Sequence, residues 1–376
     1  MNVAFLFNAQ NHQILHVLPV ACELSHLTPE TSVTVLVRTG EQVALCRRLA
    51  THYRGHRLTF EQLWLPRIVA ALGDRIGNPK ALVLWANRAS LGRYDALVVP
   101  ERTTLLLKRM GVRRPFFIHM AHGAGGADRP HDKRLRHFDL LLMPNERRLS
   151  DIAAAGNARP GHAAVIGGVK LDLIDRMGRE RPRPFPNDRP TVLYNPHHRA
   201  GTTSWAAMGE AVLDHFAESR DYNLVFAPHI RLFDPPQRHE GRFRRYRGLD
   251  HIRIDLGSDA SIDMTYTLGA DIYLGDLSSQ VLEFIGRPRP CIFLNPNRIE
   301  WRGDPNFVNW SLGPVVEDVE TMAQALAHHE TWQADYADAQ SYAFAAAFPR
   351  TEEPAPVLGA RAIAAFLLDR QRVRTA

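Results

Sequence analysis

A short segment in the second half of the chain, residues 271–296, combines hydroxyl and carboxyl side chains in an order that suits phosphate binding. In DIYLGDLSSQVLEFIGRPRPCIFLNP a predicted strand ends at Asp276, and Ser278 begins a helix that ends at Gly286. The start of a helix exposes backbone N–H groups that bind phosphate, and two hydroxyl groups add further donors. We therefore predict that Ser278 and Ser279 bind a phosphate group. The alternative is that they only cap the helix.

Glu283 adds a carboxylate to the same helix. It lies four residues after Ser279, on the same face and one turn further in. A carboxylate at this position would accept hydrogen bonds from two neighbouring hydroxyl groups, such as those of a ribose. The spacing predicts that Glu283 binds a nucleotide. The alternative is a solvated carboxylate on the helix surface.

A histidine in the first half of the chain is a candidate general base. His122 lies in HMAHGAGGADR, at the carboxyl end of a predicted strand, where open α/β sheets bind ligands. A neutral imidazole there would remove a proton from an attacking hydroxyl group. Gly123 and Gly125 leave room for a ligand to approach the backbone, and with Arg129 they are predicted to lie on the acceptor side. The alternative is a histidine bonded to its own loop.

Two further strand ends carry histidines. His197 and His198 follow one predicted strand, and His229 follows the next. Because adjacent residues point in different directions, only one of the first two is expected to face a ligand. Cationic side chains and N–H groups at the start of the next helix predict contacts with a diphosphate. The candidates for these contacts are His198, Arg199, Gly201 and Thr202. His229 would donate a proton to the leaving phosphate. Structural roles are the alternative for His198 and His229.

The sequence contains no recognisable metal-binding motif. None of the 18 histidines has the HExxH spacing, and no pair of acidic residues of the DxD kind ends a strand. Cys22, Cys46 and Cys291 are far apart and fit neither a disulfide framework nor a CxxC site. We therefore predict a protein of a reducing compartment that requires no metal and no cofactor.

Together these segments resemble the CDP-glycerol glycerophosphotransferase family, the teichoic-acid-type polymerases and primases of the GT-B superfamily. GDLSSQVLEFIGRPRPCIF matches that family's Asp-Tyr-Ser-Ser segment and the Phe-Glu and Arg/Lys-Pro residues near it, with Leu277 in place of tyrosine. HMAHGAGG resembles its His-Gly-Thr-Pro motif, VLYNPHHR its Leu-Tyr-Ala-Pro-Thr-x-Arg segment and LVFAPH its Lys-x-His-Pro segment. The resemblance covers roughly residues 115–296.

The resemblance implies a transferase, and the lack of metal motifs predicts that it needs no metal. It would move a glycerol-phosphate-type or other polyol-phosphate group from a CDP-activated donor to a hydroxyl of a cell-surface polymer or an anionic or lipid-linked glycan. Asp276, Ser278, Ser279 and Glu283 fall at its donor-binding positions, and His122 falls at the position of its base. Three alternatives remain open. They are a GT-B glycosyltransferase of surface polysaccharide synthesis with a UDP-linked or other nucleotide-sugar donor, an enzyme like the sugar-nucleotide 2-epimerases, and a non-catalytic nucleotide-binding protein.

The elements that must position these residues alternate between short β-rich runs and longer helical patterns. This order predicts parallel sheets with both faces covered. An arginine- and proline-rich segment, residues 176–190, separates two such series. We predict an α/β protein of the GT-B type, with two Rossmann-like domains facing a central cleft. Residues 1–178 would form the acceptor domain and 190–355 the nucleotide-donor domain, while a helix over 356–376 packs back on the first domain. The predicted strands lie within residues 2–9, 32–38, 94–101, 115–123 and 138–145, then 191–198, 223–229, 251–257, 271–276 and 291–295.

Composition and charge narrow the range of partners. The chain has 376 residues, 45% of them hydrophobic and 23% charged, which is the composition of a globular protein. A formal net charge of +6 favours anionic partners. No RNP-like, zinc-finger or helix-turn-helix pattern indicates nucleic acid. The two-domain size predicts a cleft between the domains.

The sequence predicts a cytoplasmic protein that contacts the inner face of the plasma membrane peripherally. No uncharged apolar run approaches the roughly 18 residues that a membrane-spanning helix needs. Residues 231–248 contain six arginines against two acidic residues, with three aromatic residues among them. This segment is the candidate contact with anionic lipid or with a phosphate-rich acceptor, and a solvated loop is the alternative.

Overall fold

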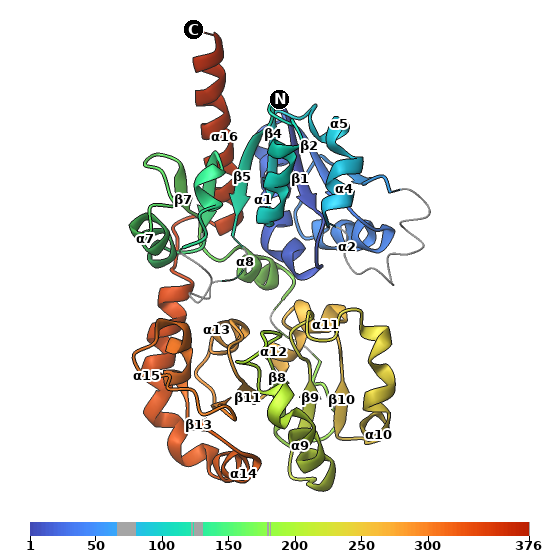
Figure 1. Ribbon diagram of the computed structural model, residues 1–376, viewed down its shortest axis with the longest axis vertical. Helices are drawn as coiled ribbons and strands as arrows, with labels where there is room; N and C mark the ends of the chain where they lie inside the picture. Colours follow the sequence, from blue (N-terminus) through green and yellow to red (C-terminus); the bar gives the residue numbers. More distant parts are fainter. Residues whose placement is uncertain (66–79, 122, 124–130, 179, 181, 376) are drawn as a thin grey trace. The chain divides into compact units, whose positions relative to one another are not determined.

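The computed structural model describes residues 1–65, 80–121, 123, 131–178, 180 and 182–375 (Figure 1). The described chain divides into two compact units. Unit 1 contains the chain up to Met177 and the segment from Phe348 onward, and unit 2 spans Gly178–Ala347. Unit 2 thus ends eight residues before the predicted boundary at 355. The reason is that Phe348 packs within unit 1, where a Cβ atom added to Gly168 would lie 2.9 Å from its ring.

Unit 1 is built on a seven-stranded parallel sheet with the order β3-β2-β1-β4-β5-β6-β7. The strands are β1 (Asn2–Phe7), β2 (Ser32–Val37), β3 (Leu58–Gln62), β4 (Ala96–Val99), β5 (Phe116–Met120), β6 (Leu140–Met143) and β7 (Ala163–Val165). The helices are α1 (His12–Leu27), α2 (Gly40–Ala50), α4 (Lys80–Ala86), α5 (Arg88–Leu91), α6 (Leu106–Arg109), α7 (Glu146–Ala154), α8 (Val169–Arg176) and α16 (Ala355–Thr375), with 3-10 turns η1 (Arg102–Leu105) and η2 (Leu135–His137).

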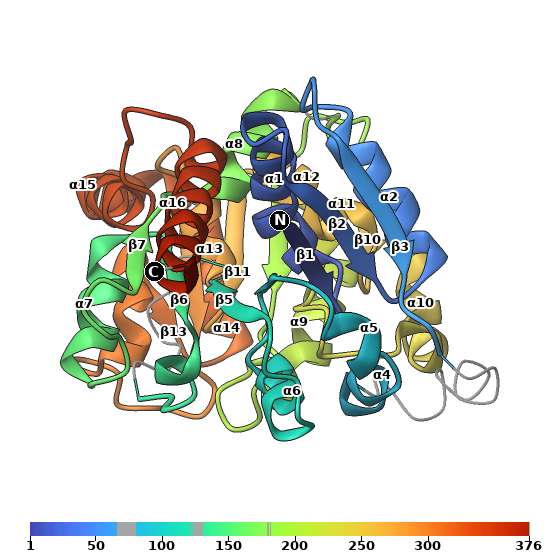
Figure 2. The same cartoon turned by 90° about the horizontal axis from the view of Figure 1, so that it is seen from above.

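Helices cover both faces of this sheet, which explains its continuous apolar strands. Ala4 and Leu6 of β1 belong to a core cluster with residues of α4, α5 and α6. The residues between them alternate to the opposite face. There α1 packs against α2, α8 and α16 (Figure 2). The C-terminal helix α16 also contacts β5, since the rings of Phe366 and Phe116 lie 5.5 Å apart.

Unit 2 repeats this architecture with a six-stranded parallel sheet in the order β10-β9-β8-β11-β12-β13. The strands are β8 (Thr191–Asn195), β9 (Asn223–Phe226), β10 (Ile252–Ile254), β11 (Ile272–Gly275), β12 (Cys291–Leu294) and β13 (Val315–Val316). The helices are α9 (Trp205–Glu218), α10 (Arg244–Arg247), α11 (Asp259–Ile262), α12 (Thr265–Gly269), α13 (Gln280–Phe284), α14 (Val319–Ala327) and α15 (His329–Ala347), with 3-10 turns η3 (Pro236–Arg238), η4 (Glu240–Phe243) and η5 (Pro305–Leu312).

The predicted fold class, two parallel α/β sheets, is confirmed. Each of the ten predicted strands corresponds to an observed one, whereas β3, β7 and β13 were not predicted. All three lie at or near an edge of their sheet, where one side of the strand is less covered. β3 has no fully buried residue, β7 has three partly buried residues, and β13 has only two residues in all. Such strands lack the long apolar run that marks a central strand.

Residues 231–248 are part of unit 2 and pack on its core rather than forming a free loop. Three aromatic side chains of this segment are at most 3% exposed and lie in the core: Phe233, Phe243 and Tyr246. Arg242 and Arg245 form ion pairs of 2.7 Å with Glu210 and Asp214 of α9. The aromatic rings are therefore core residues of unit 2, and a contact of this arginine-rich segment with anionic lipid stays a prediction. Within the described residues, no helix has both the length and the apolar composition to cross a membrane.

The strand order identifies where each sheet can bind a ligand. The order reverses between β1 and β4 in unit 1, and between β8 and β11 in unit 2. Open α/β sheets bind ligands outside the carboxyl ends of the strands at such a switch point. The candidate residues should therefore be sought in the loops that leave these strands.

Candidate active site

Three histidines converge at the carboxyl edge of the sheet of unit 2. His197 and His198 follow β8, and His229 follows β9, its parallel neighbour. The ring centroids are 4.3 Å apart for His197–His198 and for His198–His229, and 5.0 Å apart for His197–His229. All three rings therefore form one cluster, although only one of the first two histidines was expected to contribute.

Backbone N–H groups determine which nitrogen of two imidazoles carries the proton. The N–H of Arg199 donates to Nδ1 of His197 at 3.3 Å, and the N–H of Arg231 donates to Nδ1 of His229 at 3.2 Å. A ring nitrogen that accepts a hydrogen bond carries no proton, so this network assigns the proton of each neutral ring to Nε2. An Nε2–H group is a donor and therefore suits an anion.

The same histidines are close enough to hold a metal ion, a site that the sequence did not predict. One ligand nitrogen from each ring lies within 4.8 Å of the other two. A metal ligand must present a bare nitrogen and commonly donates its other ring N–H to an acceptor. In His197 and His229, however, Nδ1 does not donate: it accepts a hydrogen bond from a backbone N–H group. The nitrogen that each ring presents to a ligand therefore decides whether the cluster suits an anion or a metal ion.

A buried carboxylate holds the loop that carries two of these histidines. Asp276 directly follows β11 and is 0% exposed. Its Oδ1 accepts hydrogen bonds from the N–H groups of His197 (2.8 Å) and Leu277 (2.6 Å). Its Oδ2 accepts from the N–H (2.7 Å) and the hydroxyl (2.9 Å) of Ser204. Burial raises the pKa of Asp276, and these hydrogen bonds act in the opposite direction. Asp276 is thus buried and engaged with the protein itself, and its predicted contact with the donor stays a prediction.

The serine segment forms a shorter helix than predicted. Helix α13 has five residues, Gln280–Phe284, so its dipole is weaker than that of a full helix. Ser278 is 5% exposed, and its Oγ accepts a hydrogen bond from the N–H of Gln280 at 3.3 Å. Ser279 is exposed and is the N-cap residue. Ser279 is thus the hydroxyl of this pair that a ligand could reach.

Glu283 is buried rather than solvated. It is 9% exposed, among apolar neighbours of α13 that are also buried. This excludes the alternative of a carboxylate on the helix surface. A nucleotide contact by Glu283 stays a prediction.

The loop after Arg199 does not open a helix directly. Gly201 has a φ of +81°, and both the N–H and the hydroxyl of Thr202 donate to the Arg199 carbonyl at 3.3 Å. Helix α9 begins only at Trp205. The prediction that Gly201 and Thr202 start the helix is therefore wrong, because they form a turn. Asp276 accepts a hydrogen bond from the N–H of Ser204, the residue just before α9.

Arg289 is a positioning residue that the sequence interpretation missed. It is 7% exposed and donates to the main-chain carbonyls of Thr267, Ala270 and Phe284, which join the ends of α12 and α13. Burial lowers the pKa of Arg289 to about 10. An arginine between two prolines, directly before a buried strand, was the available signal.

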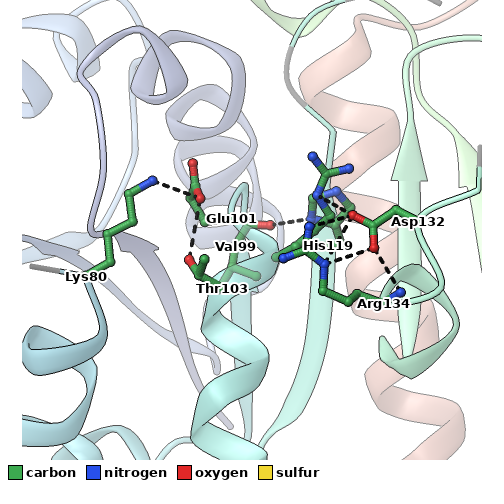
Figure 3. Close-up of polar contacts among 8 residues, drawn as sticks. Lys80, Val99, Glu101, Thr103, His119, Asp132 and Arg134 are labelled. Atoms are coloured by element: carbon green, nitrogen blue, oxygen red, sulfur yellow. Dashed lines mark hydrogen bonds and ion pairs between the residues drawn. The ribbon is translucent and has the colours of Figure 1, made fainter. Parts of the chain in front are cut away.

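The carboxyl edge of unit 1 carries ion pairs (Figure 3). Glu101, two residues after β4, pairs with Lys80 at 3.0 Å and accepts a hydrogen bond from Nε2 of Gln13 at 2.6 Å. Asp132 pairs with Arg134 at 2.7 Å. The hydrogen bond from Arg134 is the main reason that the pKa of Asp132 is lowered to about 2. His119 is buried, and its Nδ1 lies 3.1 Å from the carbonyl of Val99.

Three predicted residues of the acceptor side, His122, Gly125 and Arg129, lie outside the described residues. Gly123 is described. Its φ of +79° is one that glycine adopts without strain, and its carbonyl accepts a hydrogen bond from Arg148 at 2.8 Å. Gly123 also lines a pocket of unit 1.

Comparison with solved structures identifies the fold. The wall teichoic acid polymerase TagF has a TM-score of 0.63 at 14% identity, over 98% of this chain and 89% of that one. The S. aureus MnaA–UDP structure has a TM-score of 0.63 at 13% identity, over 100% and 98%. A UDP-N-acetylglucosamine 2-epimerase has a TM-score of 0.59 at 14% identity, over 100% and 98%. At these identities the likeness shows a shared GT-B-like fold. No curated protein has a significant sequence match to the chain.

The sequence itself matches a family model over residues 101–352, more than half of the chain. That family is described as CDP-glycerol:poly(glycerophosphate) glycerophosphotransferase. The resemblance seen in the motifs is thereby confirmed, and the chain belongs to the CDP-glycerol:poly(glycerophosphate) glycerophosphotransferase family.

Proposed function

We propose that this chain transfers glycerol phosphate from CDP-glycerol to the terminal hydroxyl of a poly(glycerophosphate) acceptor that belongs to a cell-surface polymer or a lipid-linked glycan. Unit 2 binds the donor, and unit 1 binds the acceptor. The observation that carries this proposal is the cluster of His197, His198 and His229 at the switch point of unit 2. Family membership supplies the donor and acceptor classes.

In the proposed reaction the acceptor oxygen attacks the phosphorus that bears glycerol. The bond from this phosphorus to the bridging oxygen breaks, and CMP leaves with that oxygen. His122 takes the proton of the attacking hydroxyl. Phosphoryl transfer depends mostly on positioning and on stabilisation of the charge that develops on the phosphate oxygens.

The histidine cluster provides that stabilisation. The Nε2–H groups of His197 and His229 donate hydrogen bonds to the diphosphate, and the bond from His229 stabilises the charge that develops on the leaving phosphate. His198 and Arg199 contribute further donors from the same loop. Ser279 contacts a phosphate oxygen, and Glu283 contacts the ribose. Asp276 keeps the loop in place through the N–H of His197.

The test is substitution of single histidines. His197→Ala and His229→Ala should each lower transfer from labelled CDP-glycerol by about 100-fold or more, as expected for loss of a donor to developing charge. His122→Ala should abolish transfer while the protein still binds CDP-glycerol. His328, an exposed histidine at the end of α14, provides the matched control, since His328→Ala should retain full activity. Wild-type transfer by the His197→Ala, His229→Ala double variant would remove the proposed site.

Metal independence is part of the proposal and needs its own test. The proton positions inferred for His197 and His229 disfavour a metal. Transfer should therefore be unchanged after dialysis against a chelator. Loss of transfer that Zn²⁺ restores would instead assign the histidine cluster to a metal.

Acceptor dependence separates the proposed activity from the alternatives. CMP release from CDP-glycerol should require the acceptor, whereas an epimerase would convert its donor alone. Turnover of a UDP-linked sugar in place of CDP-glycerol would favour a glycosyltransferase. Binding of donor without turnover across acceptors would indicate a non-catalytic protein.

A further inference from the structure

Two tryptophans of unit 1 are exposed on its surface and are held by one buried asparagine. Trp64, two residues after β3, is 61% exposed, and Trp85 of α4 is 50% exposed. The side chain of Asn87 accepts a hydrogen bond from the N–H of Trp64 at 2.9 Å and donates to the Trp64 carbonyl at 2.8 Å. It also donates to the carbonyl of Val83 in α4 at 2.8 Å. Trp64 is therefore fixed beside the helix that carries Trp85.

The indole N–H groups of these two tryptophans have no hydrogen-bond acceptor among the described residues. Trp310 and Trp332 of unit 2 differ, because they donate from Nε1 to main-chain carbonyls at 2.8 Å and 3.1 Å. An exposed indole combines a large apolar face with one unused donor. Such side chains are typical of the boundary between an apolar and an aqueous medium.

The surface beside Trp85 is apolar and cationic. Ala81 is exposed and lies four residues before Trp85, on the same face of α4. The guanidinium of Arg88 lies 4.8 Å from the centre of the Trp85 ring. Residues 80–93 contain three basic residues and no acidic one. Arg88 and Arg93 are exposed, and neither has an acidic partner in the described chain. This charge favours an anionic partner.

The arginine-rich segment 231–248 lacks this combination. Its three aromatic rings are buried in the core of unit 2, so its exposed surface offers charge without a large apolar side chain. Helices α4 and α5, by contrast, cover one face of the sheet of unit 1 together with α6, and they carry the exposed tryptophan and the arginine side by side (Figure 2). Contact with a membrane interface is strongest where apolar area and positive charge occur together.

We propose that Trp64, Trp85 and Arg88 form a membrane-contact surface of unit 1, and that its partner is a bilayer that contains anionic phospholipid. The indole rings enter the boundary between head groups and acyl chains, where their N–H groups donate to lipid oxygens. Arg88 pairs with lipid phosphate. Two rings and a few charges give reversible binding rather than permanent insertion. The inference does not depend on the proposed transfer reaction, since lipid binding is measured without donor or acceptor.

The first experiment measures sedimentation of the full chain with vesicles of phosphatidylcholine, with and without phosphatidylglycerol. The wild type should bind the anionic vesicles more tightly. The double variant Trp64→Ser, Trp85→Ser should lower the partition coefficient by about 10-fold or more, because the apolar area is lost. Tyr342 of α15 is 79% exposed, and Tyr342→Ser is the control that should bind like the wild type. A wild type that binds no vesicles, or a double variant that binds equally well, would overturn the inference.

The second experiment removes charge. Arg88→Gln should lower binding to anionic vesicles by about fivefold, as expected for one cation close to an anionic surface, and added salt should weaken binding of the wild type. Arg244→Gln makes the same change at an exposed arginine of α10 and should have little effect. Loss of binding on Arg244→Gln but not on Arg88→Gln would assign the contact to residues 231–248 instead.

The third experiment tests insertion directly and covers the case of a double variant that does not fold. Lipids with brominated acyl chains should quench part of the tryptophan fluorescence of the wild type, and the double variant should lose this quenching. A wild type without quenching contradicts insertion, whatever the variant does. The competing occupant of the surface is a second copy of the chain. Wild-type dimers in analytical ultracentrifugation, with a monomeric double variant whose vesicle binding is unchanged, would make the surface a dimer contact.

Discussion

The first strands of the two sheets both lead into a buried asparagine, and the two asparagines are paired very differently. Asn195 ends β8 in unit 2, where its Nδ2 donates to the Ala227 carbonyl at 2.6 Å and its Oδ1 accepts from the Tyr273 hydroxyl at 3.4 Å. Asn8 follows β1 in unit 1 and is 0% exposed. Within the described part of the chain, neither polar atom of its amide has a hydrogen-bond partner.

The difference is that the buried amide at the edge of unit 2 is already hydrogen-bonded within the protein, whereas the one at the edge of unit 1 is not bonded to any described residue. In unit 2 the polar groups at the switch point bond to one another, so the loop that carries His197 and His198 is held by contacts within the protein. In unit 1 the Oε1 atom of Gln13 is also buried without a partner among the described residues. Buried polar groups are almost always satisfied by protein, water or ligand. The buried amide groups of Asn8 and Gln13 at the edge of unit 1 therefore lack partners within the described residues, unlike the amide of Asn195 in unit 2.

Removal of Asp276 should have the largest effect. Asp276→Ala deletes the acceptor of four hydrogen bonds in a fully buried place and leaves their donors unsatisfied. We expect the free energy of unfolding to fall by more than about 3 kcal/mol, as for loss of a buried charged partner. Urea unfolding of the full chain, followed by tryptophan fluorescence, measures the change.

Asp271 provides the control for this variant. Its carboxylate accepts a hydrogen bond from the N–H of Thr191 at 2.9 Å, at the amino ends of β8 and β11, and the residue is exposed. Asp271→Asn should cost less than about 1 kcal/mol. Equal stability of Asp276→Ala and the wild type would mean that the histidine loop is held by other contacts.

Substitution of Asn8 or Asn195 by leucine tests the difference in hydrogen bonding between the two sheet edges. Asn195→Leu keeps the approximate volume but leaves the Tyr273 hydroxyl and the Ala227 carbonyl without their partner, so it should cost about 1–3 kcal/mol. Asn8→Leu removes an unsatisfied amide and should be neutral or stabilising by about 1 kcal/mol. Thermal and urea unfolding of the two variants give these values. A larger loss for Asn8→Leu than for Asn195→Leu would reverse the comparison.

The strands were predictable because their burial is a property of local sequence. ALVV of β4 is buried on both faces and therefore reads as a continuous apolar run. The same rule failed for β3, whose residues LTFEQ are exposed or only partly buried. The positions of His198 and His229 after neighbouring strands also followed from the strand pattern alone.

The assembly of the site was not predictable, because it depends on contacts between distant residues. His197 joins the cluster since the loop after β8 is tied to the next one, with the N–H of His229 donating to the Pro196 carbonyl at 2.9 Å. Asp276 bonds to Ser204, which is 72 residues away in sequence. Alternation along a strand gives no information about either contact.

The ion pairs at the edge of unit 1 should produce the smallest effect, and one that depends on pH. The pKa of Asp132 is lowered to about 2, chiefly by the hydrogen bond from Arg134, whereas an unfolded aspartate titrates near pH 3.9. The folded state therefore favours the ionised carboxylate. Its contribution to stability is present above about pH 4 and is lost as the pH falls towards 2.

Asp132→Asn should accordingly differ most from the wild type at pH 5 and converge with it near pH 2, in urea unfolding measured at steps between these values. Asp188, which is fully exposed beside Arg183, supplies the control, because Asp188→Asn should change stability little at any pH in this range. A difference for Asp132→Asn that stays constant from pH 5 to pH 2 would show that the side chain acts through packing. In that case the charge of Asp132 would not contribute to the stability of the fold. The edges of units 1 and 2 would then differ only in how their buried polar groups are hydrogen-bonded.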